Sequence, residues 1–238
     1  MSSKNDFEIN ARAVHRGPLL SLLAIVFTVL FVASIVANFI MTGGAPYPTP
    51  YRPIPYLQEY YTRFPDALRV TAFLQFGSVM PLGIFSVTVV SRLLFHRIKV
   101  AGVYIALFGG ITASIFLGIS ALSAWVLSQP GVATETGAMR AIQLFAFATG
   151  GVGHTATLGL LLAGVSVPCL FVRLIPRWVA WYGLGIAAIA ELSVLSLIFP
   201  AVSILLPLSR FPALIWLIAV GFTLPKHRQS FSEANLAA

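Results

Sequence analysis

Six long apolar stretches occupy most of the 238-residue chain. They lie near residues 18–40, 70–91, 100–127, 141–168, 178–199 and 202–224. A helix rises about 1.5 Å per residue, so about 20 residues cross a hydrocarbon core that is about 30 Å thick. Lipid offers backbone groups no hydrogen-bond partner, so each stretch must satisfy its own as a helix. We therefore predict an all-α fold, a polytopic integral membrane bundle of six transmembrane helices.

The composition excludes a soluble protein and leaves no room for a second domain. Hydrophobic residues make up 58% of the chain and charged residues only 9%, whereas soluble domains average about 25% charged. The predicted membrane domain spans residues 17–225, between a tail at 1–16 and a tail at 226–238. The longest connection, 41–65, has only 25 residues.

The formal net charge of +8 is explained by topology. With the N-terminus in the cytoplasm, ten Lys and Arg residues fall on the cytoplasmic side and five on the outer side. The five assigned to the outer side are Arg52, Arg63, Arg69, Arg140 and Arg210. Basic residues accumulate in cytoplasmic loops, so we predict that both termini are cytoplasmic. The partner of this charge is then the lipid bilayer and not a nucleic acid.

The outer connection at 41–65 is the most distinctive polar segment, with six prolines and five tyrosines. This composition predicts extended, polyproline-like backbone with rings lying on the lipid headgroups. A lid over the bundle, or a segment that binds another membrane protein, is the alternative. The last two stretches are predicted to be joined by a corner around 207–212.

Two ionisable residues, His154 and Glu191, are predicted deep in the membrane. Such residues are costly in lipid and normally face the bundle interior. They follow small-residue stripes on consecutive antiparallel helices, so the two side chains can face each other, in contact or offset by up to about two turns. We consider them polar anchors of a ligand site or an interhelical clasp. Arg140 is predicted to add a cationic contact, and Gln75, Asn38 and Gln143 are predicted to add polar lining.

Several chemistries have no signature in the chain. Zinc proteases need HExxH, which is absent, and no phosphate-binding loop or nucleophile elbow is present. His154 is the only histidine predicted within a span, so bis-histidine haem ligation is excluded. We predict no cofactor, no metal site and no catalytic residue, which favours a protein that is not an enzyme.

Three segments carry a resemblance to a known group. They are YYTRFPDALRVTAFLQFGSVMPLGIFSVTVVSRL, GGVGHTATLGLLLAGVSVPCLF and LIPRWVAWYGLGIAAIAELSVLSLIFPA. Together they resemble bacterial multi-spanning membrane proteins of the DUF4386-like group over most of residues 60–225. The resemblance implies a multi-pass protein of the bacterial cell (inner) membrane, and it supplies no functional residues.

Three functions are consistent with these observations. The first is binding of a small amphiphile or lipid in the bundle interior, with His154 and Glu191 as polar anchors. The second is a small proton-coupled transporter that uses the same pair. The third is an accessory or regulatory subunit that binds a membrane protein partner through the 41–65 segment.

Overall fold

The computed structural model describes residues 14–227 and confirms the all-α fold. Six helical spans are long and apolar enough to cross a membrane, so the chain is a multi-pass membrane protein. The helices that build them are α2 (Leu20–Met41), α4 (Pro65–Phe95), α5 (Ala101–Leu127), α6 (Thr136–Phe147) continuing into α7 (His154–Phe171), α8 (Arg177–Leu192) and α9 (Leu205–Thr223). Which end faces the cytoplasm stays a prediction.

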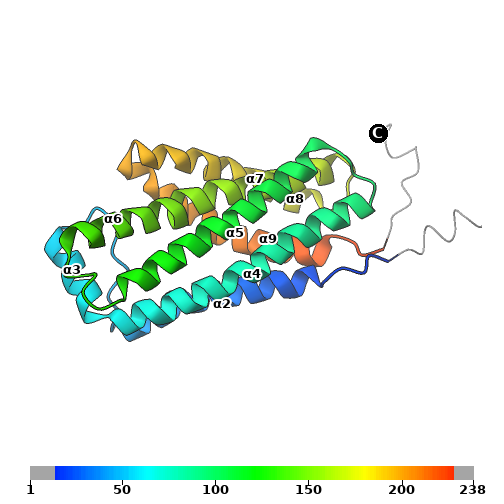
Figure 1. Cartoon of the computed structure of the whole chain (residues 1–238). Helices are drawn as coiled ribbons and strands as arrows, with labels where there is room; N and C mark the ends of the chain where they lie inside the picture. Colours follow the sequence, from blue (N-terminus) through cyan, green and yellow to red (C-terminus); the bar gives the residue numbers. More distant parts are fainter. Residues whose placement is uncertain (1–13, 228–238) are drawn as a thin grey trace, which may run out of the picture.

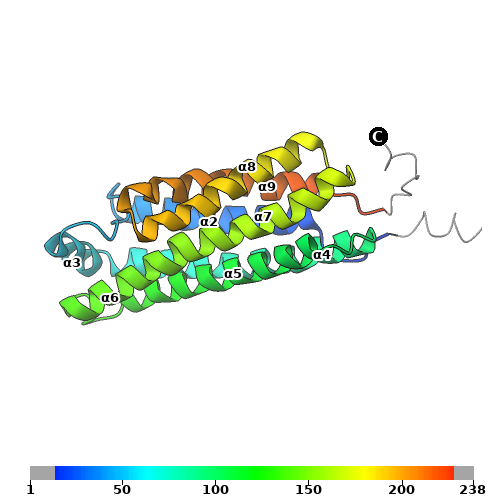
Figure 2. The same cartoon turned by 90° about the horizontal axis from the view of Figure 1, so that it is seen from above.

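The six spans run side by side (Figures 1 and 2), and the contacts between them close a ring. Each packs against its neighbours in the chain, and α9 returns to pack against α2, so the order is α2, α4, α5, α7, α8 and α9. Val14 pairs with His227 in an antiparallel bridge at one end of the ring, called here the terminal end. The opposite end carries the short helix α3 (Ile54–Arg63) and is called the α3 end.

Close contact between α5 and α7 fills the terminal half of the ring. A Cβ atom on Gly164 would lie 2.5 Å from the carbonyl oxygen of Gly102 and 2.6 Å from the nitrogen of Ala106. Small residues at such positions let two backbones touch, which is the main source of helix association in lipid. Nearby, Trp216 of α9 is fully buried, and its Nε1 donates a hydrogen bond to the carbonyl of Val179, 3.1 Å away.

The connection at 41–65 is only partly extended, and its C-terminal half forms α3. Leu57, Tyr60 and Tyr61 lie on one face of this helix and are buried in a cluster that includes Leu68 and Met139. The expectation that all the rings lie on headgroups is therefore wrong for Tyr60 and Tyr61, and burial raises the pKa of both. The i, i+3, i+4 spacing of these three residues is the helical pattern that the proline content obscured.

The turn between α8 and α9 lies earlier in the chain than the sequence predicted. It falls at 198–199, between the 3₁₀ segments η2 (Ser193–Leu197) and η3 (Pro200–Ile204). The predicted corner at 207–212 is instead part of α9, because Pro207 lies in the first turn of that helix, where its missing N–H costs no hydrogen bond. The turn stops short of α3 in both views (Figures 1 and 2), and Ile198 and Phe199 at its tip are exposed.

Candidate functional site

A cavity of about 800 Å³ occupies the α3 end of the ring. Its walls come from α2, α4, α5, α6, η3, α9 and a π-helical segment, η1 (Ala148–Gly153), between α6 and α7. Residues 45–51, which follow α2, lie over it and are called here the cover segment. Part of the Pro/Tyr-rich connection thus contributes to an interior space.

Contacts at both ends hold the cover segment over the cavity. Near its start, the hydroxyl of Thr42 donates a hydrogen bond to the carbonyl of Ala45, 2.9 Å away. Near its end, Nη1 of Arg140 donates to the carbonyl of Pro50. The ring of Tyr51 packs edge-on against Phe147, with centroids 5.9 Å apart. Arg140, predicted as a ligand contact, therefore ties the cover segment to α6.

Two buried amides in the cavity wall have unpartnered N–H groups. The Tyr60 hydroxyl donates to Oδ1 of Asn38 at 2.9 Å, and Nδ2 of Asn38 has no partner. Oε1 of Gln143 accepts from Arg140 at 3.1 Å, and Nε2 of Gln143 has no partner. A guanidinium can only donate, so the contact with Arg140 fixes the orientation of the Gln143 amide. Both nitrogens are enclosed by protein, and the Gln143 amide also interacts with the Tyr61 hydroxyl.

Arg210 is the charged residue of the cavity wall. Its Nη2 donates to the carbonyl of Gly150, with longer contacts of 3.4 Å to the carbonyl of Gly151 and 3.3 Å to the hydroxyl of Thr155. Its guanidinium carbon lies 5.8 Å from the centre of the Phe31 ring, while Nε is buried without a partner. Nη2 thus binds backbone carbonyls, while Nε makes no hydrogen bond.

The prediction that Arg210 lies in an outer corner between the last two spans is wrong. Arg210 belongs to α9, within the span Pro200–Thr223. The signal that identifies it is a single basic residue within an otherwise apolar helix, the kind of intramembrane cation that marks functional sites. The two nearby prolines concealed that signal, because they suggested a loop.

The π-helical segment η1 explains why backbone carbonyls are available to Arg210. Its sequence, ATGGVG, is rich in glycine, and its wider turn departs from the usual i to i+4 ladder. Ser120 donates its hydroxyl to the carbonyl of Ala146 at 2.9 Å, and Arg210 donates to that of Gly150. Single π-helical turns are frequent at functional sites, and this one forms part of the cavity wall.

No carboxylate among residues 14–227 neutralises Arg210. The acidic residues in this range are Glu59, Asp66, Glu135 and Glu191, and all four are exposed. The one ion pair found in this range joins Asp66 to Arg69, 2.9 Å apart at the α3 end. The cavity wall therefore carries a positive charge that no acidic side chain in this range neutralises.

Of the predicted site residues, the polar ones Gln75, Asn38 and Gln143 line the cavity, whereas Arg140, His154 and Glu191 do not. His154 is fully buried on α7, and its Nδ1 donates to the carbonyl of Ala113, 2.9 Å away on α5. Glu191 is exposed on α8, with its carboxylate beside Gly159 of α7. His154 and Glu191 form no hydrogen bond with each other. His154 contacts α5, whereas Glu191 lies at the surface of the bundle.

The cavity also has an apolar side. Phe39 of α2, Ile204 of η3 and Phe211 of α9 contribute to its lining and are themselves exposed on the outside of the bundle. Because these residues belong to membrane-spanning segments, their exposed surfaces face lipid.

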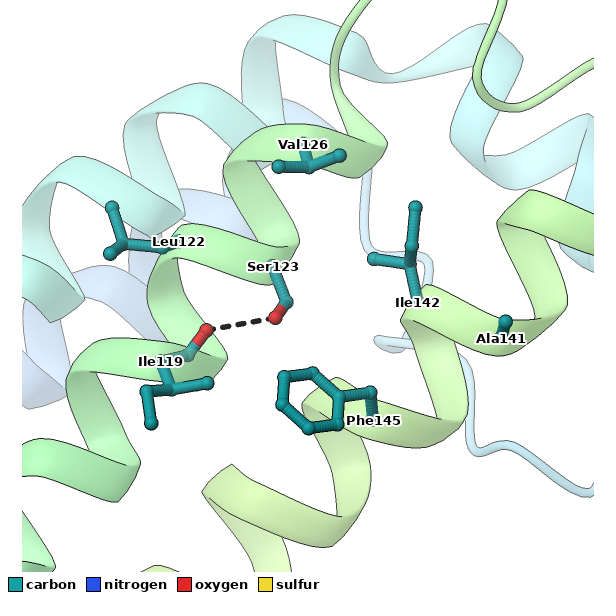
Figure 3. Close-up of a pocket in the computed structure, with 7 residues that line it drawn as sticks. All are labelled: Ile119, Leu122, Ser123, Val126, Ala141, Ile142 and Phe145. Carbon is teal, nitrogen blue, oxygen red and sulfur yellow. Dashed lines mark hydrogen bonds between the residues drawn. The ribbon is translucent and has the colours of Figure 1, made fainter.

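A second, more open groove of about 410 Å³ lies between α5 and α6 (Figure 3). Its lining is apolar except for Ser123, whose hydroxyl donates to the carbonyl of Ile119 at 2.8 Å within α5. That bond leaves the groove without a free polar group. It provides surface for lipid chains but nothing that would orient a polar ligand.

No protein-family model matches the chain, and neither a curated protein nor a solved structure is significantly similar to it. The class of protein is therefore defined by the fold and the cavity alone: a six-span helical membrane protein with a largely apolar cavity at one end that includes a few polar residues. The resemblance to the DUF4386-like group stays a prediction.

Proposed function

We propose that this protein binds a small single-chain amphiphile in the cavity at the α3 end. One observation carries the proposal: Asn38, Gln143 and Arg210, the last with no carboxylate partner among residues 14–227, line a space whose walls are otherwise mostly apolar. Ligand cavities typically enclose about 300–1,000 Å³, and this one encloses about 800 Å³. The polar part of the ligand would contact the three polar side chains, and its chain would lie between α2 and α9.

The predicted orientation gives the ligand a route. If basic residues hold the termini in the cytoplasm, the α3 end lies at the outer face of a bacterial cell membrane. A ligand would then enter sideways from the outer leaflet, beneath the cover segment. His154 and Glu191 have no direct part in this proposal, because neither lines the cavity.

Binding of two chain-matched probes, hexadecanol and palmitate, tests the proposal. The protein in lipid nanodiscs is titrated with each probe, and saturable binding is measured by native mass spectrometry. Ala124→Phe places a ring in the cavity wall, and Ala188→Phe places the same ring on the exposed surface of α8. We expect binding to wild type and to Ala188→Phe, and its loss in Ala124→Phe.

The result that contradicts the proposal is also specific. Wild-type protein that binds neither probe in a saturable manner, or an Ala124→Phe variant that binds both as well as wild type does, would remove the cavity as the ligand site.

A further inference from the structure

We infer that the ligand of this cavity carries an anionic head group, a carboxylate or a phosphate, that binds to Arg210. The inference rests on the proposed function, and it adds the chemical class of the ligand. It rests on the charges and hydrogen-bond donors of the cavity wall and not on the volume of the cavity.

Arg210 has hydrogen bonds but no counter-ion. The carbonyls of Gly150 and Gly151 accept from Nη2 and supply only partial negative charge. A full positive charge in a membrane-spanning helix is costly unless a negative group lies nearby. Every acidic side chain among residues 14–227 is exposed, so the described protein does not provide that group within the cavity. A bound anion beside the guanidinium, which lines the cavity, would provide it.

The amides reinforce this preference. Asn38 and Gln143 line the cavity, and their side-chain oxygens are already occupied by Tyr60 and Arg140, so these amides offer a ligand few free acceptors. Asn38 is seven residues from Phe31, which contacts Arg210, and Gln143 is seven residues from Gly150. Seven residues correspond to about 10 Å of helical rise, so the amides lie about two turns nearer the α3 end than Arg210 does. Arg140 beside Gln143 adds a second positive charge on that side.

Carboxylates and phosphates fit this wall because they offer several lone pairs, carry negative charge and, when ionised, need no acceptor from the protein. A neutral alcohol offers only one oxygen to the donors of the cavity wall, and it leaves Arg210 without a counter-ion. A cationic head group would be repelled by Arg210. Head-group charge is therefore the property that the cavity selects.

Three probes with the same chain separate head-group selection from binding itself: hexadecanol, palmitate and hexadecyl phosphate. We expect wild-type protein in nanodiscs of neutral lipid to bind the two anions at least about tenfold more tightly than the alcohol, as for a charge-assisted hydrogen bond in a buried site. The stronger of the two anions then identifies the carboxylate or the phosphate as the preferred source of charge. Arg210→Gln should bind all three probes with similar affinity.

Arg210→Gln also removes the hydrogen bonds from Arg210 to the π-helical segment, and their loss would affect folding. A second variant therefore keeps Arg210 in place. Gln143→Glu keeps an oxygen that accepts from Arg140, removes the Nε2 donor and adds a negative charge to the wall. We expect it to weaken binding of both anions by about tenfold and to leave hexadecanol unchanged. Gln129→Glu introduces the same charge at the end of α5, outside the cavity, and should bind all three as wild type does.

The outcomes distinguish the two proposals. Equal affinity of wild type for hexadecanol and the two anions would overturn the anionic head group while leaving amphiphile binding in place. Unchanged anion binding in both Arg210→Gln and Gln143→Glu would also overturn it. No binding of any probe would overturn the proposed function itself.

Discussion

The two halves of the ring use the same helices in opposite ways. In the terminal half, Gly102 and Gly164 bring the backbones of α5 and α7 into contact, and Trp216 is fully buried. In the α3 half, the π-helical segment η1 and the short turn between α8 and α9 accompany a cavity of about 800 Å³. Lipid supplies no hydrophobic force that would collapse such a space, so stability must come from packing elsewhere. The comparison assigns stability to the terminal half and ligand recognition to the α3 half.

The largest effect is expected from Gly164→Ala, which breaks the packed half. The new Cβ would lie 2.5 Å from the carbonyl oxygen of Gly102 and 2.6 Å from the nitrogen of Ala106, and these are backbone atoms that cannot rotate away. Overpacking of this kind costs about 1–3 kcal/mol. The free energy of unfolding, measured by denaturant titration in mixed micelles, should fall by that amount.

Gly185→Ala is the matched control, because a Cβ at that position meets nothing within 4 Å. It should keep wild-type stability or exceed it, since alanine favours the helix over glycine by up to about 1 kcal/mol. Equal losses in the two variants would show that the contact between α5 and α7 is not what sets stability.

A smaller effect is expected from enlarging a side chain in the hollow half. Ala146 lines the cavity, so Ala146→Leu adds its methyl groups to open space and should change the free energy of unfolding by less than about 1 kcal/mol. The same denaturant titration measures it beside Gly164→Ala. A loss as large as that of Gly164→Ala would contradict the division of the ring into packed and hollow halves.

The smallest effect concerns pH at the terminal end. The backbone N–H of His15 donates to the carbonyl of Lys226 at 2.9 Å, and Nε2 of His15 shares a hydrogen bond with the Ser91 hydroxyl at 3.0 Å. Burial, and then the positive charges of Arg92 and His96, lower the pKa of His15 below 6.5. The folded end therefore binds this proton less readily than the unfolded chain does.

The sign follows from linkage. The contribution of His15 is complete above pH 6.5 and is lost as the pH falls through that value toward the lowered folded pKa. Hydrogen exchange at 14–19 and 224–227, corrected for intrinsic rates, should be faster at about pH 5.5 than at about pH 7.5. His15→Gln should remove the difference, whereas a difference that persists in this variant would assign it to another group.

The sequence predicted the spans well, but it did not determine which side chains meet in the cavity, and particular residues show why. The stretch predicted at 100–127 is the helix Ala101–Leu127, because apolar length in lipid is a local property. Glu191 was predicted to face inward from the spacing of small residues, but it is exposed on α8. Helical spacing defines a stripe, and only the neighbouring helices decide which stripe is covered.

Arg210 shows the same limit from the other side. Two prolines made its segment look like a corner, whereas one of them lies in the first turn of α9 and the other within that helix. Asn38 and Gln143 were predicted as polar lining, and both line the cavity. What only the structure shows is that Tyr60 and Arg140 occupy their side-chain oxygens.

By itself, then, the sequence determined a multi-pass helical membrane protein, since about 20 consecutive apolar residues have one stable form in lipid. The tertiary structure decided that α9 closes the ring against α2, that residues 45–51 cover its α3 end and that Arg210 faces the space between them. The physical reason is range: span formation depends on residues a turn or two apart, whereas the cavity depends on which side chains meet across helices that are distant in the chain.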